Sequence, residues 1–139
     1  MALTVLSSCK YDIHIGQTDG NGNVTTEERI NGAFFDQVKG SSGLDVYLTE
    51  GSETKVVVEA DENLQGIIET EIRGGLLHIK TTENIGRSKS KKVYVTYTEL
   101  TSVAASSGAD VIANSVVKSE NLTLDASSGA DLELEIFSK

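Results

Sequence analysis

Three aspartates occupy the same position in three copies of one short motif, and they are the clearest candidates for chemistry in this chain. Asp45, Asp110 and Asp131 each stand two residues after a Ser-Ser-Gly sequence. Carboxylates aligned in this way could bind Ca²⁺, or could serve as the paired carboxylates of a polysaccharide-cleaving enzyme. Glu133 and Glu135 follow the last aspartate and extend the acidic pattern.

The pattern favours a plainer interpretation, a solvated acidic face. The Gly-Gly-rich nonapeptide of calcium-loaded repeats is absent. Two carboxylates about 4.8 Å apart in water repel by only roughly 0.9 kcal/mol before screening, so a metal is not needed to tolerate them. Sugar-cleaving grooves also need aromatic platforms, whereas this chain has no Trp and offers only Tyr47 and Tyr94 as outward aromatics. We therefore expect no catalytic residue, no metal ligand and no cofactor, with calcium binding as the first alternative and catalysis as the last.

The two histidines do not suggest a reactive centre. His14 and His78 are far apart in the sequence, and their spacing from Cys9 matches no zinc motif. The sequence also has no phosphate-binding glycine motif, no nucleophile elbow and no HExxH. We expect both histidines to be exposed or to lie in a linker.

The single cysteine follows Leu6-Ser7-Ser8, a sequence that resembles the lipobox of bacterial lipoproteins. In that motif the cysteine is lipidated and becomes the mature N-terminus, so Cys9 is the expected lipidation site. Only eight residues precede it and none is Lys or Arg, which predicts that residues 1–9 are the remnant of a longer signal peptide. We expect residues 10–23 to form a flexible tether and residues 24–139 to form the domain.

The charge balance narrows the choice of partners. The formal net charge is −9, which argues against nucleic acid. One basic run, Arg87 to Lys92, could contact an anionic glycan or a lipid headgroup, but a solvated loop is the favoured interpretation. No apolar run reaches the roughly 18 residues of a membrane-spanning helix, so only the lipid is expected to contact the membrane.

The elements that carry the aspartates repeat at a fixed distance. Residues 105–113 recur almost unchanged as residues 126–134, which is 21 residues later, and a related copy spans residues 40–48. Within each copy apolar and polar residues alternate, which predicts half-buried strands with the aspartates facing outward. The residues expected to face inward are Leu44, Val46 and Leu48 in the first copy, Ala109, Val111 and Ala113 in the second, and Ala130, Leu132, Leu134 and Ile136 in the third.

A period of 21 residues fits three short strands joined by tight corners. Stacked turn upon turn, this unit predicts an all-β, β-helix-like solenoid in which equivalent strands pair in parallel. Leu44, Ala109 and Ala130 would then form one interior column. Membership of Leu44 is the weaker part of this prediction, because the first copy is not one period away.

The first half of the chain is less regular, and two interpretations stay open. Residues 44–48 and 55–59 flank one turn-like segment, and residues 68–72 and 76–79 flank the pair Gly74-Gly75. Each pair of strands could form a hairpin or could meet at a solenoid corner. Residues 83–92 are expected to form a loop before the next strand.

The ordered series of motifs resembles the auto-transporter adhesin head-domain family, a family of unassigned biochemical function. The resemblance rests on the lipobox, residues 20–24, 35–48, 56–63 and 75–79, and the repeated Ser-Ser-Gly-Ala-Asp. It implies a right-handed β-helix-like fold and a lipoprotein of the bacterial cell envelope, at the outer membrane or cell surface. Because family members carry more repeats, it also predicts that residues 24–139 are truncated at their C-terminal end.

These observations predict a non-catalytic adhesin or binding module whose partner is a surface protein or a glycan. The first alternative is a self-associating envelope scaffold that forms homo-oligomers through exposed strand edges. A polysaccharide-acting β-helix enzyme is the remaining alternative.

Overall fold

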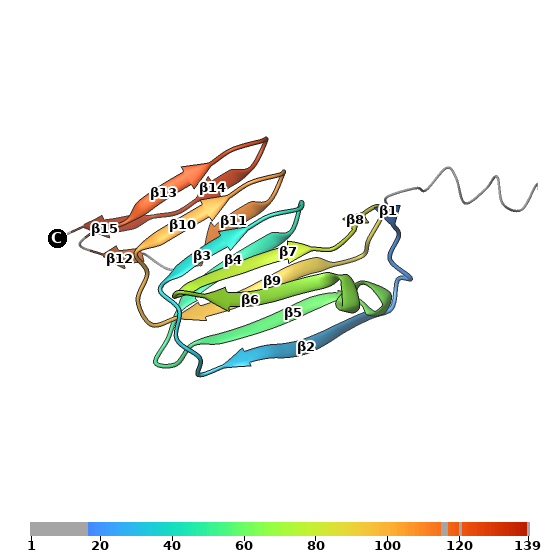
Figure 1. Ribbon diagram of the computed structural model, residues 1–139, viewed down its shortest axis with the longest axis horizontal. Helices are drawn as coiled ribbons and strands as arrows, with labels where there is room; N and C mark the ends of the chain where they lie inside the picture. The colour runs from blue at the N-terminus through green and yellow to red at the C-terminus, as the bar shows by residue number, and fades with distance from the viewer. Residues whose placement is uncertain (1–16, 115–116, 120, 139) are drawn as a thin grey trace, which may run out of the picture.

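The protein is all-β in the computed structural model, which describes residues 17–114, 117–119 and 121–138 (Figure 1). Two sheets lie one over the other with the hydrophobic core between them. The five-stranded sheet has the order β13 (Thr123–Ala126), β10 (Ser102–Ala105), β3 (Gln37–Gly40), β7 (Leu76–Thr81) and β6 (Ile68–Arg73). The six-stranded sheet has the order β14 (Asp131–Glu133), β11 (Asp110–Ala113), β4 (Asp45–Glu50), β9 (Lys91–Tyr97), β5 (Lys55–Asp61) and β2 (Val24–Asn31).

Three smaller pieces complete the described chain. β1 (Gln17–Thr18) pairs with β8 (Asn84–Ile85), and β12 (Val117–Ser119) pairs with β15 (Ile136–Ser138). A 3₁₀ helix, η1 (Glu62–Ile67), connects β5 to β6. The segment 17–23 contacts the rest of the domain through β1, while the domain boundaries expected from the sequence stay a prediction.

The 21-residue spacing is a strand-pairing register at the C-terminal end. β10 pairs in parallel with β13, and β11 pairs in parallel with β14, each with an offset of 21 residues. The third pair, β12 with β15, joins Val117 to Ile136 and has an offset of 19 residues. Equivalent residues of the two Ser-Ser-Gly-Ala-Asp copies therefore lie next to each other.

The first copy of the motif stacks directly on the second. β3 pairs with β10 and β4 pairs with β11, although the paired residues are 65 apart in the sequence. The chain between them does not continue the stack but forms β6 and β7 of one sheet and β5 and β9 of the other. Leu44 and Ala109 are fully buried and Ala130 is partly buried, so the expected inward facing of this column is confirmed.

The rest of both sheets follows no common period. β6 and β7 form an antiparallel hairpin around Gly74 and Gly75, as one of the two open interpretations predicted. A hairpin of β4 and β5 is wrong, because β9 lies between them, parallel to β4 and antiparallel to β5. The two sheets are therefore mixed. Residues 83–92 also contain β8 and the start of β9, so they are not a continuous loop.

The Ser-Ser-Gly corners use two consecutive left-handed residues. Ser42, Ser107 and Ser128 have φ values of 63°, 52° and 54°, and the glycine after each of them is also at positive φ. The corners stack through backbone hydrogen bonds, in which Gly43 N donates to Ser107 O at 2.9 Å and Gly108 N donates to Ser128 O at 3.1 Å. Serine rarely adopts this conformation, so its occurrence at all three corners is a specific feature of this motif.

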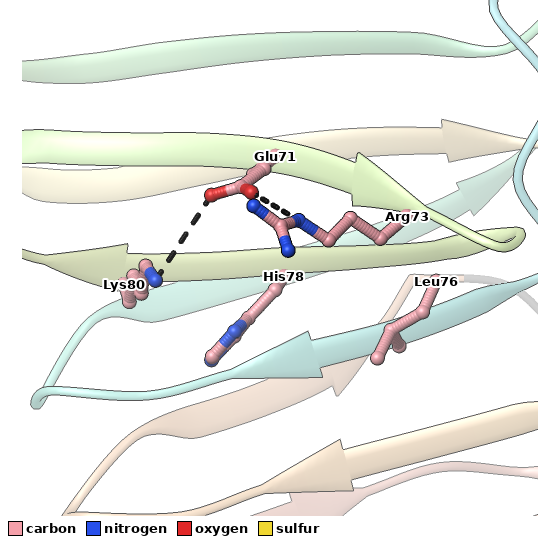
Figure 2. A pocket seen from close by; sticks show the side chains of 5 residues that line it. All are labelled: Glu71, Arg73, Leu76, His78 and Lys80. Atoms are coloured by element: carbon pink, nitrogen blue, oxygen red, sulfur yellow. Dashed lines mark hydrogen bonds and ion pairs between the residues drawn. The ribbon is translucent and has the colours of Figure 1, made fainter.

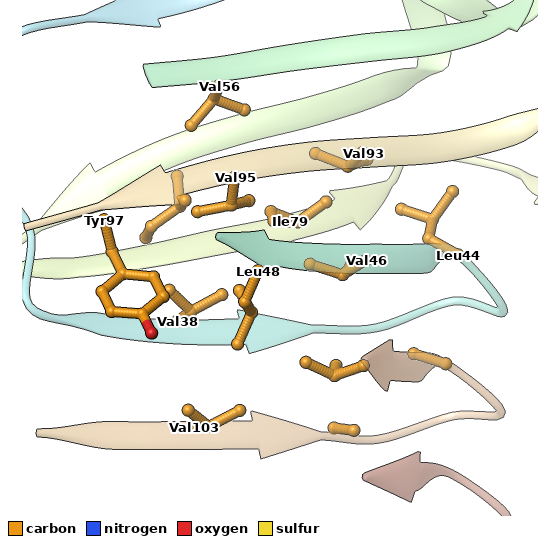
Figure 3. Packing of buried hydrophobic residues seen from close by; sticks show 14 of the residues in the cluster. Val38, Leu44, Val46, Leu48, Val56, Ile79, Val93, Val95, Tyr97 and Val103 are labelled. Atoms are coloured by element: carbon orange, nitrogen blue, oxygen red, sulfur yellow. The ribbon is translucent and has the colours of Figure 1, made fainter. Parts of the chain in front are cut away.

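The core is built mainly from aliphatic side chains that point between the sheets, and Tyr97 packs among them (Figure 3). Its fully buried members include Val46, Leu48, Val56, Ile79 and Val93, as the alternating pattern of the strands requires. Burial falls toward the C-terminal end. Val103 is fully buried, whereas Leu124, its register partner one coil further on, is 43% exposed. Within the described chain, the last coil is therefore covered on one side only.

Candidate functional site

The aspartate ladder lies on the outer face of the six-stranded sheet. Asp45 pairs with Asp110, and Asp110 pairs with Asp131, so the three carboxylates are adjacent in register as the repeat predicted. Partial burial raises the pKa of Asp110, and the neighbouring charges of Asp45 and Asp131 raise it further. The described residues hold no group of three or more His, Cys, Asp or Glu side chains arranged to bind a metal ion. The ladder is a strip of negative charge on a sheet surface.

Lysines border this ladder on one side. Lys92 lies beside Asp45 in the pairing of β9 with β4. The charge of Lys91 offsets a small part of the rise in the pKa of Asp110. Sequence reasoning placed both lysines in a solvated loop, but they begin β9. Because both lysines lie near Asp45 and Asp110, the negative charge of this sheet face is least balanced around Asp131 and Glu133 on β14.

An apolar strip runs across four strands of the same face, beside the ladder. It consists of Val57, Tyr94, Tyr47 and Ile112, which lie opposite one another on β5, β9, β4 and β11. The rings of Tyr47 and Tyr94 stack with their centroids 5.4 Å apart and their planes 21° from parallel. The sequence predicted that both tyrosines face outward. Their stacking became visible only with the register, because they are separated by 47 positions in the chain.

A shallow pocket of about 310 Å³ lies on the five-stranded sheet, over β6 and β7 (Figure 2). Arg73 Nε donates a hydrogen bond of 2.6 Å to Glu71 Oε1, and Lys80 Nζ lies 4.0 Å from Glu71 Oε2. The hydrogen bond from Arg73, followed by the charges of Arg73 and Lys80, holds the pKa of Glu71 below its usual value. Leu76 and His78 complete the lining.

His78 is half-buried in this pocket, and the expectation of an exposed or linker histidine is wrong for it. Burial lowers the pKa of His78, and the charges of Lys39 and Lys80 lower it further, so the site favours the neutral ring. Its Nε2 lies 3.2 Å from Ser41 Oγ, which lies 3.1 Å from Ser106 Oγ. Ser41 is only 8% exposed. These contacts join the first two Ser-Ser-Gly corners to β7. No motif in the sequence predicts them.

Two of the residues singled out in the sequence, Cys9 and His14, lie outside the described residues. Lipidation of Cys9 therefore stays a prediction. Across residues 17–114, 117–119 and 121–138, no helix has the length and apolar character needed to cross a bilayer.

These features define an all-β domain that presents flat strand faces and shallow pockets. The chain belongs to the family described as "Putative auto-transporter adhesin, head GIN domain", whose model matches residues 34–139. The family resemblance inferred from the ordered motifs is confirmed.

Solved structures share the fold. A protein named a putative adhesin, from Parabacteroides merdae, has a TM-score of 0.70 and 25% identity, over 80% of this chain and 47% of its own. A protein named a putative lipid binding protein, from Parabacteroides distasonis, has a TM-score of 0.75 and 22% identity, over 86% and 52% of the two chains. A protein named a putative adhesin, from Bacteroides fragilis, has a TM-score of 0.72 and 14% identity, over 86% of this chain and 57% of its own.

The chain spans about half the length of these three proteins. The comparison with curated proteins found no match.

Proposed function

We propose that this chain is a non-catalytic binding domain displayed at the cell envelope, which binds a protein partner through the outer face of the six-stranded sheet. The family description and the names of two similar structures support an adhesive role. The single observation that carries the proposal is the apolar strip of Val57, Tyr94, Tyr47 and Ile112 beside the aspartate ladder.

The chemistry of this face suits a protein partner. Tyrosines are enriched in protein interfaces, where they bury a large area and lose little conformational entropy. Tyr94 is 38% exposed and already stacked on Tyr47, so this part of the face is ordered before a partner arrives. The ladder beside it favours a partner that carries Lys or Arg next to an apolar patch.

The strip can be tested by direct binding measurements. We would compare the wild-type domain, Tyr94→Ala and Val24→Ala on an array of purified envelope, host-surface and matrix proteins and of glycans. Val24 is the matched control, because it is equally exposed at 38% but lies outside the strip. We expect Tyr94→Ala to weaken a protein interaction by about tenfold or more, while Val24→Ala leaves it unchanged. A blank array for the wild type, or equal binding by both variants, contradicts the proposal.

The envelope location rests on Cys9. A diacylglycerol chain on this residue, with residues 10–23 as a tether, would hold the domain at a membrane surface. Expression of the gene with its natural signal sequence should yield a membrane-associated protein of increased mass. Cys9→Ser should release it into the soluble fraction with the same fold. An unmodified wild-type protein in the soluble fraction contradicts the anchor.

The absence of catalysis is part of the proposal. Within the described residues the ladder carboxylates follow one line along the stack, at equivalent positions of neighbouring parallel strands. Turnover of a polysaccharide that is lost in Asp110→Asn would refute this part.

A second candidate is self-association through the last coil. Leu124 is 43% exposed, and β13 and β14 are the outermost strands of the two sheets. Open strand edges beside apolar side chains can pair with another copy. Light scattering coupled to size exclusion should then show dimers or larger species, which Leu124→Lys disperses. A strict monomer at tens of micromolar excludes this candidate.

The finer architecture is also part of the proposal. We take β10–β12 and β13–β15 as two turns of a right-handed β-helix, which the 21-residue register of two of the three strand pairs supports. A crystal structure of the longer natural protein tests this, because left-handed connections or a different register would contradict it.

A further inference from the structure

A second hollow lies at one end of the six-stranded sheet, where three connections meet. It has a volume of about 330 Å³ and involves no residue of the apolar strip. The β2–β3 connection, the β4–β5 loop and the segment after β9 line it with Asn31, Gly32, Phe34, Ser52, Glu53, Thr54 and Thr98. Phe34 is 60% exposed, more than any other large hydrophobic side chain of the described residues.

Backbone and side-chain hydrogen bonds hold the three connections together. Gly32 N donates to Thr54 O at 2.8 Å, and Thr54 Oγ1 donates to Ala33 O at 2.6 Å. Gly51 N donates to Tyr97 O at 2.9 Å, which fixes the β4–β5 loop against the end of β9. Thr54 is 5% exposed, so these bonds are shielded from water. The hollow is therefore preformed, which lowers the entropic cost of binding.

The position of Phe34 is also set by its neighbour. Phe35 is fully buried in the core, which anchors the backbone and leaves the preceding ring at the surface. The larger part of that ring is open to solvent. An exposed aromatic ring retains a hydrophobic surface that a ligand can cover.

The other lining groups select the ligand class. Asn31 and Glu53 provide amide and carboxylate groups, and Ser52 and Thr98 provide hydroxyls. Asn31 Nδ2 donates to Glu28 Oε1 at 3.2 Å, which orients the amide. The lining contains one carboxylate and no cationic side chain, so phosphate, sulfate and uronate groups are disfavoured. The described residues also hold no cluster of three or more His, Cys, Asp or Glu side chains that could bind Ca²⁺ here.

We propose that this pocket binds a neutral sugar, in the form of one hexopyranose unit of a glycan. The apolar C–H face of the sugar ring stacks on Phe34, and its hydroxyls pair with Asn31 and Glu53. The volume lies at the lower end of the range of small-molecule sites, which suits one or two sugar rings. Because the pocket is shallow and open, the affinity for a single ring is expected to be about millimolar.

Amide NMR titration tests the proposal with defined sugars. Glucose, galactose, mannose and N-acetylglucosamine are added separately to the isotope-labelled protein, with glucuronic acid as the charged comparison. We expect saturable shifts at residues 31–34, 52–54 and 98 for at least one neutral sugar. Phe34→Ala should weaken that binding by about tenfold or more, while Phe34→Trp should retain it. Val24→Ala is the matched control, since it removes an exposed apolar side chain that belongs to neither the pocket nor the apolar strip.

The outcomes separate this inference from the adhesive role proposed above. The sugar site is overturned if no neutral sugar gives saturable shifts, if glucuronic acid alone binds, or if Phe34→Ala binds as the wild type does. Shifts at the apolar strip without shifts at the pocket also overturn it. Binding of the proteins on the array by the wild-type domain would be unaffected by any of these results, because that interaction depends on Tyr94 and involves no residue of the pocket. Since Phe34 is exposed, preserved spectral dispersion will show that its variants are folded.

Discussion

Asp61, at the end of β5, is a buried acidic residue with several hydrogen-bond partners. Asp61 is only 1% exposed. Its carboxylate accepts backbone hydrogen bonds from Gly22 N at 2.8 Å and from Lys89 N and Ser90 N at 2.9 Å. Burial alone would raise the pKa of Asp61, but the N–H groups of Ser90, Gly22 and Lys89 together hold it below its ordinary value. A Cβ on Gly20 would collide with this carboxylate. Asp61 thus joins the segment before β2 to the segment before β9.

Replacing Asp61 with Asn should destabilise the fold without changing the volume of the side chain. The amide nitrogen cannot accept a hydrogen bond, so at least one buried backbone N–H loses its partner, at a cost of about 1–3 kcal/mol. Urea unfolding followed by circular dichroism measures the difference. Glu62→Gln, at the exposed neighbouring position, is the control and should be neutral.

The stabilisation from Asp61 should depend on pH in a defined direction. Because the folded-state pKa lies below the ordinary value of 3.8, this stabilisation is complete above pH 3.8 and is lost as the pH falls through the folded-state pKa. The stability difference between the wild type and Asp61→Asn should therefore shrink only below about pH 3.8. A difference that stays constant down to the acid limit of the fold would contradict the carboxylate's role.

Asp110 should behave in the opposite way. Its pKa is raised by partial burial and by Asp45 and Asp131, so the ionised form opposes folding and the penalty disappears as the pH falls through the folded-state pKa. We expect Asp110→Asn to stabilise the protein at neutral pH by about 0.2–1 kcal/mol, the range for like charges on paired strands. Thermal unfolding should show a smaller gain at high salt and none at acidic pH. Destabilisation at neutral pH would indicate that the ladder binds a stabilising cation.

At the scale of strands and corners, the packing depends on which side chains face the core and on how closely neighbouring strands approach each other. An ideal Cβ on Gly40 would lie 3.0 Å from Val46 Cγ2 and 3.2 Å from Val111 Cγ2, so β3 can approach β4 and β11 this closely only with glycine at that position. The Ser-Ser-Gly corners turn the chain between the two sheets immediately after β3, β10 and β13. The motif therefore encodes both the turn and the distance between the layers.

Substitutions at inward-facing positions of β11 and β14 should destabilise the protein far more than substitutions at outward-facing positions. Val111→Asp places an unpaired charge in the core and should abolish the cooperative unfolding transition, whereas Asp131→Asn should change stability by less than about 0.5 kcal/mol. Leu132→Asp should fall between them, because Leu132 belongs to the incompletely covered last coil. Chemical denaturation of the three variants gives the order. A costly Asp131→Asn with a tolerated Val111→Asp would reverse the assigned facing.

Across the whole molecule, stability should decline from the middle of the stack to its C-terminal end (Figure 1). β4 and β9 have a partner on both sides, whereas β13 and β14 are edge strands over which no further described strand packs. Local opening is easiest where few apolar contacts must be broken. We expect the amides of β13 and β14 to exchange with solvent faster than those of β10 and β11 in hydrogen-exchange measurements on a dilute sample. Equal protection of the two coils would show that the last coil is covered by another copy.

The whole-molecule arrangement was only partly predictable. The repeated Ser-Ser-Gly-Ala-Asp and its alternating neighbours predicted the strands, the outward aspartates and the register of Asp110 with Asp131. They did not predict that β9 separates β4 from β5. Alternation states which face of a strand is buried but not which strand lies beside it, and an inserted strand leaves that pattern unchanged.

What the sequence determined by itself was therefore local or periodic: all-β character, two-residue alternation, turns at Ser-Ser-Gly, and the family. Only the tertiary structure decided the stacking of Tyr47 on Tyr94, the contact of His78 with Ser41, the burial of Asp61 and the meeting of three connections around Phe34. Each of these joins segments far apart in the chain. The free energy that selects such contacts comes from packing and hydrogen bonding between strands, which no short stretch of residues records.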